Sequence, residues 1–382
     1  MKNEDLILKV RELNHESVRL YQQGKFDHAF EIARQAVSIS RSLGEEHPDY
    51  ATSLHNLAFL YQAMGRCEKA EPLYLRLLEI VRKALGEEHP NYAVSLHNLA
   101  ALYISMGRYE KAEPLLKQAL EIVRNVLGDK HPGYASSLNT LAVLYKEMGR
   151  YEKAEPLLKQ ALEIVRNVLG DKHPGYAASL HNLAALYESM GLYEKAEPLY
   201  RQALEIRRKA LGVEHPDYAT SLHNLAGLYE GMGQYEKAEP LYRQALEIRR
   251  KALREEHPDY AVSLNNLAVL YYSMGRYEKA EPLFRQALEI RRKALGEEHP
   301  AYATSLHNLA GWYDSMGRYE KAEPLYLQAL DIVRKALGEE HPDYATKLHT
   351  LAVLYESMGL YEKAEPLMRK ALEITKKALG DE

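Results

Sequence analysis

The sequence is poor in several residue types, and each scarcity excludes a class of protein. One cysteine and one tryptophan occur in 382 residues, so neither a disulfide framework nor a cysteine-rich zinc site is available. Lys and Arg number 50 against 54 Asp and Glu, which lacks the positive excess that nucleic-acid binding requires. No apolar run approaches the length of a membrane span. We therefore expect neither a nucleic-acid nor a membrane partner.

Proline is absent from any stretch that could serve as a linker, because all 16 prolines occupy two repeated positions. Eight of them follow a histidine, and these histidines recur every 42 residues. A fixed period of this size predicts stacked helical units, in which each unit packs on its neighbours. The eight histidines are His47, His89, His131, His173, His215, His257, His299 and His341.

The repeat sets the expected domain organisation. Residues 47–382 form eight units of 42 residues, and residues 1–46 hold a degenerate ninth unit that we expect to cap the N-terminal end. We predict one continuous solenoid domain. The last unit is nearly regular and has no polar capping helix after it, so we expect either further chain or self-association at that end.

One unit shows why each is a pair of helices. In the unit that begins at His215, Leu222, Leu225, Ala226 and Tyr229 share an arc of about 100°, which predicts a first helix, helix A. Pro216 suits the first turn of that helix, and the residue before a proline is biased away from helical angles. The predicted helix therefore starts at the His-Pro dipeptide.

A second helix, helix B, follows the break at Gly233. Its apolar positions are Tyr235, Ala238, Tyr242, Ala245 and Leu246, and a basic run at residues 249–251 suits the C-terminal end of the helix dipole. Pro240 lies about six residues inside helix B, so we expect a bend or a late helix start. Arg254 replaces the glycine that ends helix B in most units, and we expect it to be strained by about 1 kcal/mol if the cap is kept.

These residues carry a family resemblance. The pattern Leu-x-x-Leu-Ala-x-x-Tyr, then Gly-x-Tyr-x-x-Ala, then Tyr-x-x-Ala-Leu resembles the tetratricopeptide repeat. The 42-residue length, with HPDYATSLHNLA and YEKAEPLYRQALEIRRKALG, is similar to the kinesin light chain type. The resemblance implies an all-α, right-handed superhelical solenoid, in which helices A line a concave groove that binds an extended or helical peptide.

The helical wheel places this groove independently. Opposite the core stripe of the unit at His47 lie Thr52, His55, Asn56 and Phe59, about 150° from Leu54. Their equivalents form ladders along the chain. The histidine ladder comprises His55, His97, Asn139, His181, His223, Asn265, His307 and His349, and the asparagine ladder comprises Asn56, Asn98, Thr140, Asn182, Asn224, Asn266, Asn308 and Thr350. These amides could hydrogen-bond a ligand backbone, or they could tie neighbouring helices together; both interpretations stay open.

Two further ladders vary more. The small-residue ladder contains Phe59, Ala101, Val143, Ala185, Gly227, Val269, Gly311 and Val353, which would leave shallow pockets. One turn on, the acidic ladder contains Gln62, Ile104, Lys146, Glu188, Glu230, Tyr272, Asp314 and Glu356. Its acids predict a preference for neutral or basic ligand segments. The four helix A ladder positions 52, 55, 56 and 59 and their equivalents contain no Lys or Arg, which argues against acidic peptides.

Nothing in the sequence indicates an active site or a metal centre. Every polar group recurs in near-copies, whereas a catalytic site needs unlike residues that converge once, so we expect no enzyme activity and no cofactor. Helices pack about 8 to 10 Å apart, which prevents ladder histidines from sharing an ion bound at about 2 Å. Cys67 stands where most units have Tyr, which predicts a core residue and a reducing, cytoplasmic compartment.

The sequence thus predicts a non-enzymatic scaffold that binds a peptide or protein in the groove. Two alternatives remain: a structural protein that self-assembles, and the sensor arm of a larger signalling protein.

Overall fold

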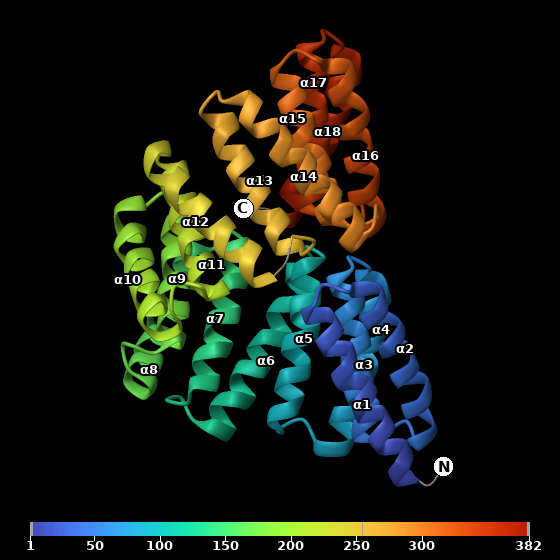
Figure 1. Cartoon of the computed structure of the whole chain (residues 1–382). Helices are drawn as coiled ribbons and strands as arrows, with labels where there is room; N and C mark the ends of the chain where they lie inside the picture. Colours follow the sequence, from blue (N-terminus) through green and yellow to red (C-terminus); the bar gives the residue numbers. More distant parts are fainter. Residues whose placement is uncertain (1–2, 254, 380–382) are drawn as a thin grey trace. The chain divides into compact units, whose positions relative to one another are not determined.

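The structure is a computed structural model that describes residues 3–253 and 255–379 (Figure 1). Within these residues the chain forms eighteen α-helices and one short 3-10 helix, and no strand occurs among them. The predicted all-α fold of helix pairs is therefore confirmed. Arg254, for which a strained cap was predicted, lies outside the described residues.

Each 42-residue unit contributes one helix A and one helix B, as the repeat predicts. The A helices are α3 (Pro48–Ala63), α5 (Pro90–Ser105), α7 (Pro132–Glu147), α9 (Pro174–Ser189), α11 (Pro216–Gly231), α13 (Pro258–Ser273), α15 (Pro300–Ser315) and α17 (Pro342–Ser357). The B helices are α4 (Cys67–Leu85), α6 (Tyr109–Leu127), α8 (Tyr151–Leu169), α10 (Tyr193–Leu211), α12 (Tyr235–Leu253), α14 (Tyr277–Leu295), α16 (Tyr319–Leu337) and α18 (Tyr361–Leu379).

The degenerate N-terminal unit is also a helix pair. It consists of α1 (Asn3–Gln22) and α2 (Phe26–Ser40), followed by the 3-10 helix η1 (Arg41–Leu43). Phe30 and Ala33 of α2 pack with Leu57 and Leu60 of α3 in one apolar cluster. The unit therefore covers the first regular repeat through the same kind of contact that joins the others.

Each A helix whose cap geometry is described begins at the proline of a His-Pro dipeptide, and the histidine ring caps it. His215 is extended, with φ −75° and ψ 137°, and its ring Nδ1 accepts the backbone N–H of Asp217 at 3.1 Å. One of the unsatisfied N–H groups of the first turn is thereby paired. The predicted helix start is confirmed, and the histidine adds a cap that periodicity alone did not reveal.

Helix B tolerates its internal proline. α12 begins at Tyr235 and runs without interruption through Pro240, so the helix does not start late. Gly233 precedes it with a φ of +70°, a conformation that glycine adopts without strain. The Pro240 side chain is exposed, where its ring displaces no core residue.

The core lies between the two helices of each unit and those of the next. Leu222, Leu225 and Ala226 of α11 are buried as predicted, and Tyr229 is buried with them. In α12 the predicted Ala238, Tyr242 and Ala245 are also buried, whereas Tyr235 and Leu246 are only half-buried. Burying a Leu side chain contributes about 2 kcal/mol, so each repeated stripe stabilises its own junction.

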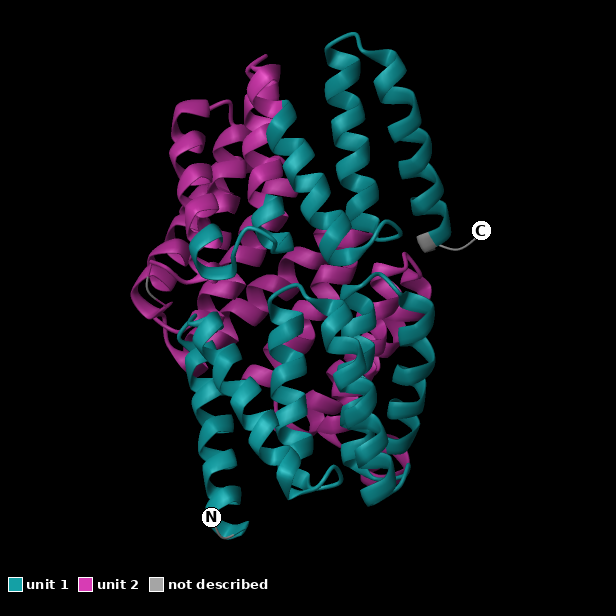
Figure 2. Ribbon diagram, turned by 90° about the vertical axis from the view of Figure 1, so that its right-hand side faces the viewer, with its two compact units in different colours: residues 1–122, 292–304, 323–382 teal, residues 123–291, 305–322 magenta. Residues whose placement is uncertain are grey.

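Contacts divide the chain into two compact units (Figure 2). Unit 1 comprises residues 1–122, 292–304 and 323–382, and unit 2 comprises residues 123–291 and 305–322. The single continuous domain that the repeat predicts stays a prediction. No helix among the described residues is long and apolar enough to cross a membrane.

Candidate functional site

The histidine and asparagine ladders meet across neighbouring A helices. Asn98 Nδ2 lies 3.3 Å from Nδ1 of His55 in the preceding unit, and Asn224 Nδ2 lies 3.0 Å from Nδ1 of His181. Asn266 Nδ2 lies 2.7 Å from Nε2 of His223. Because an amide nitrogen can only donate, each of these histidines accepts the hydrogen bond and is neutral.

The same link forms where histidine is replaced by asparagine. Asn308 Nδ2 donates to Oδ1 of Asn265 at 2.9 Å, and Asn56 Nδ2 donates to Oδ1 of Asn14 at 3.2 Å. Asn14 lies on α1, in the degenerate unit, and the sequence pattern did not single it out. Helix-to-helix hydrogen bonds of the kind foreseen by the structural interpretation are thus present. Ligand binding by the ladder stays a prediction.

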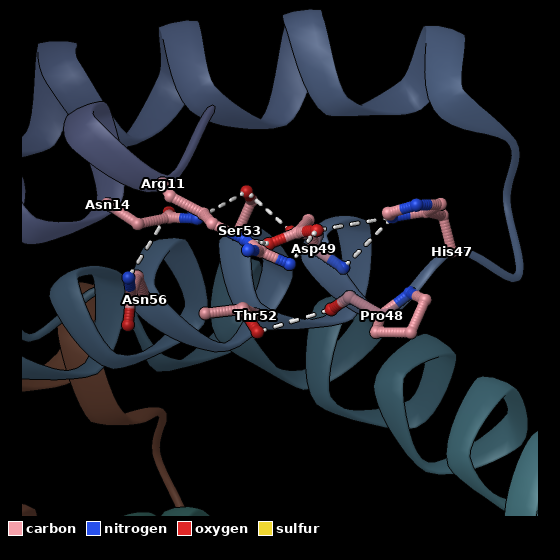
Figure 3. A network of polar contacts seen from close by, with 8 residues as sticks. All are labelled: Arg11, Asn14, His47, Pro48, Asp49, Thr52, Ser53 and Asn56. Atoms are coloured by element: carbon pink, nitrogen blue, oxygen red, sulfur yellow. Dashed lines mark hydrogen bonds and ion pairs between the residues drawn. The ribbon is translucent and has the colours of Figure 1, made fainter. Parts of the chain in front are cut away.

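A polar network joins α1 to α3 around Asn14 and Asn56 (Figure 3). Asn14 Nδ2 also donates to Oγ of Ser53 at 3.0 Å. Arg11 Nε donates to a carboxylate oxygen of Asp49 at 2.9 Å, beside the capping ring of His47. The degenerate unit therefore reproduces the ladder contact with residues that do not match the repeat.

Burial keeps four ladder histidines, His55, His97, His181 and His223, neutral. Desolvation, helped by the nearby charge of Arg207 for His181 and of Arg249 for His223, lowers the pKa of both histidines to about 4. Burial also lowers the pKa of His55 and His97. Nδ1 of His223 is buried without a hydrogen-bond partner. These four histidines are therefore uncharged polar groups at neutral pH.

The small-residue ladder is exposed in several repeats. Phe59, Val143 and Val353 are 40%, 36% and 38% exposed. The Phe59 ring packs edge-on against Tyr21, with centroids 4.9 Å apart. Apolar surface is thus available at this position in both compact units.

The acids of the predicted acidic ladder are held by tyrosines of helix B. The Tyr200 hydroxyl donates to Glu188 at 2.6 Å, and the Tyr242 hydroxyl donates to Glu230 at 2.9 Å. Burial raises the pKa of Glu230. These two carboxylates are half-buried, so they can meet a ligand only with their remaining oxygen surface.

The other members of the acidic ladder differ from these. Burial raises the pKa of Asp314, Glu356 is exposed, and Tyr272 packs against Tyr277 with ring centroids 5.8 Å apart. Of the remaining predicted residues, His97, Asn139, His307 and His349 lie at the histidine-ladder position of their own A helices, and Asn182 lies at the asparagine-ladder position of α9. The structure thus places all predicted residues on A helices, and the hydrogen bonds described above between members of the histidine and asparagine ladders join neighbouring repeats.

Sequence reasoning missed a row of arginines on helix B. The sequence predicted only that the basic run containing Arg249 suits the C-terminal end of the helix dipole, but Arg249 is 8% exposed and donates to Oγ of Ser263 at 2.7 Å. Arg207 donates to Oγ of Ser221 at 2.8 Å. Burial lowers the pKa of both guanidinium groups, which still remain charged at neutral pH. The signal was present in the sequence, because other units carry valine here, as at Val81.

The equivalent place in unit 1 is a pocket. It has a volume of about 340 Å³ and lies between α3, α4 and α5. Thr52, His55 and Asn98 form its polar side, while Ile80, Val81 and Val94 belong to its apolar side. Arg249 also donates to Oγ1 of Thr220, the equivalent of Thr52. Arg207 and Arg249 therefore occupy, in their own repeats, the position that Val81 leaves open in the first regular repeat.

The described residues contain no group of three or more His, Cys, Asp or Glu side chains that could hold a metal ion. Cys67 is buried, as predicted, and burial raises the pKa of its thiol. The thiolate, which is the reactive form, is therefore disfavoured.

Comparison with known families gives one matching description. A family model described as Tetratricopeptide repeat matches residues 18–76, 50–125, 98–167, 146–209, 176–251, 217–293, 259–335 and 315–377. These matches span most of the chain. The search of curated proteins found no match.

Three solved structures show the range of similarity. A putative kinesin light chain from Podosopora anserina with nearly identical TPR-like repeats is 36% identical, covering 54% of this chain and 97% of its own, with a TM-score of 0.45. BtubC (BKLC) from P. vanneervenii is 28% identical, covering 60% of this chain and 92% of its own, with a TM-score of 0.50. A Rap protein complexed with Competence and Sporulation Factor is 16% identical, covers 97% and 99%, and shares the fold with a TM-score of 0.57.

Proposed function

Because the chain belongs to the tetratricopeptide repeat family, whose members serve as protein-interaction scaffolds, we propose that it binds a segment of a partner protein along its A helices. The observation that carries the proposal is the pocket between α3, α4 and α5, which combines exposed apolar side chains with ladder amides.

The pocket suits an apolar anchor side chain of a peptide. Its volume of about 340 Å³ exceeds that of one large side chain. Val94, at its edge, is 55% exposed, so a ligand that covered it would remove apolar surface from water. Asn98 and His55 stand beside the apolar wall, where polar groups can orient a peptide backbone. An anchor with flanking backbone contacts is the expected mode of binding.

Charge differs along the A helices of unit 2. The arginine row lies by the N-terminal half of helix A, near Thr220, and Glu188 and Glu230 lie near its C-terminal end. Ten helical residues separate the two levels, or about 15 Å. We propose that a neutral or basic part of the ligand lies at the acidic end, and that the arginines limit this preference to that end.

The ladder residues enter the proposal with a double role. The side-chain amides of Asn98 and Asn224 already donate a hydrogen bond to a histidine of the neighbouring helix. Each retains a carbonyl oxygen that could accept a hydrogen bond from a ligand amide. We also propose a cytoplasmic location, which fits the single buried thiol.

A peptide library selected on the full chain tests the proposal. We expect it to enrich peptides with a bulky apolar anchor, and we expect Val94→Glu to weaken their binding at least about tenfold, because a charge would enter the apolar contact. Binding is measured by fluorescence anisotropy of an enriched peptide.

The matched control is Val126→Glu, since Val126 is similarly exposed, at 46%, but does not line the pocket. If no peptide is enriched, or if both variants bind the enriched peptide as tightly as the wild type does, the groove proposal is wrong.

A further inference from the structure

Two His-Pro dipeptides of unit 1 contact turns that precede them by 236 residues. His299 Nε2 lies 2.8 Å from the carbonyl oxygen of Ala63, the last residue of α3. His341 Nε2 lies 3.2 Å from the carbonyl oxygen of Ser105, the last residue of α5. The contact thus forms twice, in successive units, with the same atoms and the same sequence separation.

The cap explains why the histidine is suited to this contact. Nδ1 of His299 accepts the backbone N–H of Ala301 at 2.9 Å, and Nδ1 of His341 accepts that of Asp343 at 3.0 Å. A neutral ring that accepts at Nδ1 carries its proton on Nε2, which therefore points outward as a donor. The carbonyls in the last turn of a helix lack intrahelical partners. One ring thus joins the start of one helix to the end of another.

Glycine allows the two segments to approach closely. A Cβ atom on Gly65 would lie 2.4 Å from Cδ of Pro300, and one on Gly107 would lie 2.7 Å from Cδ of Pro342. Either distance is shorter than nonbonded atoms permit. The glycine after helix A therefore has two roles. It adopts the positive φ of the turn, and its missing side chain leaves room for the proline ring.

Unit 2 also contains His-Pro dipeptides and glycine turns of this kind, but those described next do not contact each other. His131, His173 and His215 each accept a backbone N–H at Nδ1, at 3.0, 3.0 and 3.1 Å, and no Nε2 partner is found for them among the described residues. We call these three His-Pro dipeptides the His edge. Their rings are exposed, so each Nε2 donor faces solvent.

The acceptor half is equally open. We call the turns at Gly149, Gly191 and Gly233 the Gly edge. A Cβ atom on any of the three would meet nothing within 4 Å, in contrast to Gly65 and Gly107. The carbonyls of Glu147, Ser189 and Gly231, which end α7, α9 and α11, accept no hydrogen bond within the described part of the chain.

We propose that the chain self-associates, with the His edge of one copy docking on the Gly edge of another. The occupant is a second copy because this chain carries both halves at the same 42-residue spacing, so several contacts would form in register. Charge supports the pairing. In unit 1, Glu298 and Lys69 line the pocket beside the contact, and unit 2 places Glu214 before a His-Pro and Lys237 after a turn.

Sedimentation velocity of the full chain over a concentration series tests the proposal. We expect the wild type to shift from monomer to a larger species as concentration rises. The triple variant Gly149→Asn, Gly191→Asn and Gly233→Asn should raise the dissociation constant at least about tenfold, because asparagine tolerates positive φ while its side chain blocks the incoming proline.

A second variant attacks the other edge. His131→Asn, His173→Asn and His215→Asn preserve a good N-cap but remove the Nε2 donor, so helix content by circular dichroism should stay constant while association weakens at least about tenfold. His349→Asn, away from the His edge, is the matched control and should associate like the wild type.

Two outcomes would overturn the proposal: a wild type that stays monomeric at every concentration, and edge variants that associate as strongly as the wild type. The proposal does not depend on the peptide-binding function, because no residue of either edge lines the pocket at Val94.

Discussion

At the scale of single residues, the position of each histidine ring decides what it does. The ring of His215 lies at a helix start and pairs a backbone N–H, whereas His223, eight residues later, is largely buried and accepts from an asparagine of the next unit. Both are neutral acceptors. They differ in solvation, because the His215 side chain is exposed and that of His223 is not.

The buried ladder histidines should make stability depend on pH. In the folded chain the pKa of His181 and His223 is about 4, below the value of about 6.5 in an unfolded chain. Between about pH 6.5 and 4 these two histidines bind protons in the unfolded chain but stay unprotonated in the folded chain. The free energy of unfolding therefore falls as the pH decreases toward 4. We expect a loss on the order of 2 kcal/mol for each histidine, measured by urea unfolding between pH 7.5 and 4.

The double variant His181→Asn and His223→Asn is the appropriate comparison, because the chain itself has asparagine at Asn139 and Asn265 of this ladder. Its stability should fall less steeply with acid. An unchanged pH dependence would show that these histidines are not the titrating groups.

The surroundings of single residues could be predicted from the sequence only in part. The helical wheel located the ladders because their 42-residue recurrence and their angle from the core are properties of the sequence. It did not predict the burial of Arg249, because the wheel was applied to helix A and the neighbouring hydroxyls of Ser263 and Thr220 come from two other helices.

At the scale of the element, the two repeated prolines have opposite effects. Pro216 stands at the first position of α11, where no N–H is missed, and Pro240 stands inside α12, where the carbonyl of Glu236 loses its partner. The same residue type therefore favours one helix and weakens the other.

This contrast can be tested by two substitutions. Pro240→Ala restores a helical hydrogen bond and should raise the free energy of unfolding by about 1 kcal/mol or more. Pro216→Ala loses the preset φ and should lower it by about 0.5 to 1 kcal/mol. Chemical denaturation of both variants measures the change in the free energy of unfolding. Changes of the same sign would contradict the opposite effects assigned to the two prolines.

Helix starts and ends were predictable because their signals are local. The extended bias of the residue before proline and the positive φ of the turn glycine act within a few residues. The ring cap by histidine was not predicted, since histidine is not among the usual capping residues and only the ring orientation shows the contact.

At the scale of the whole molecule, the contacts of His299 and His341 join distant parts of unit 1. A simple solenoid has contacts only between neighbouring repeats, so a change at one repeat leaves distant repeats unaffected. Because His341 hydrogen-bonds the carbonyl of Ser105, we expect a change at His341 to affect the distant turn after α5.

Replacing His341 by Asn should preserve the cap of α17 and break this bond. We expect faster amide hydrogen exchange in the turn at residues 106–108, because its partner across the contact is lost. Hydrogen exchange with mass spectrometry measures the change, and the equivalent turn at residues 190–192 is the internal reference. Unaltered exchange at residues 106–108 would contradict the contact.

The sequence by itself determined the family, the helix pairs, the helix starts and the buried stripes. All of these follow from periodicity and from preferences that act within one repeat or between neighbours. Only the tertiary structure decided that ladder amides bond the next helix, that Arg249 fills the place of a pocket, and that His341 reaches Ser105. The physical reason is that small rotations between repeats accumulate along the chain, and no residue pattern within one repeat specifies their sum.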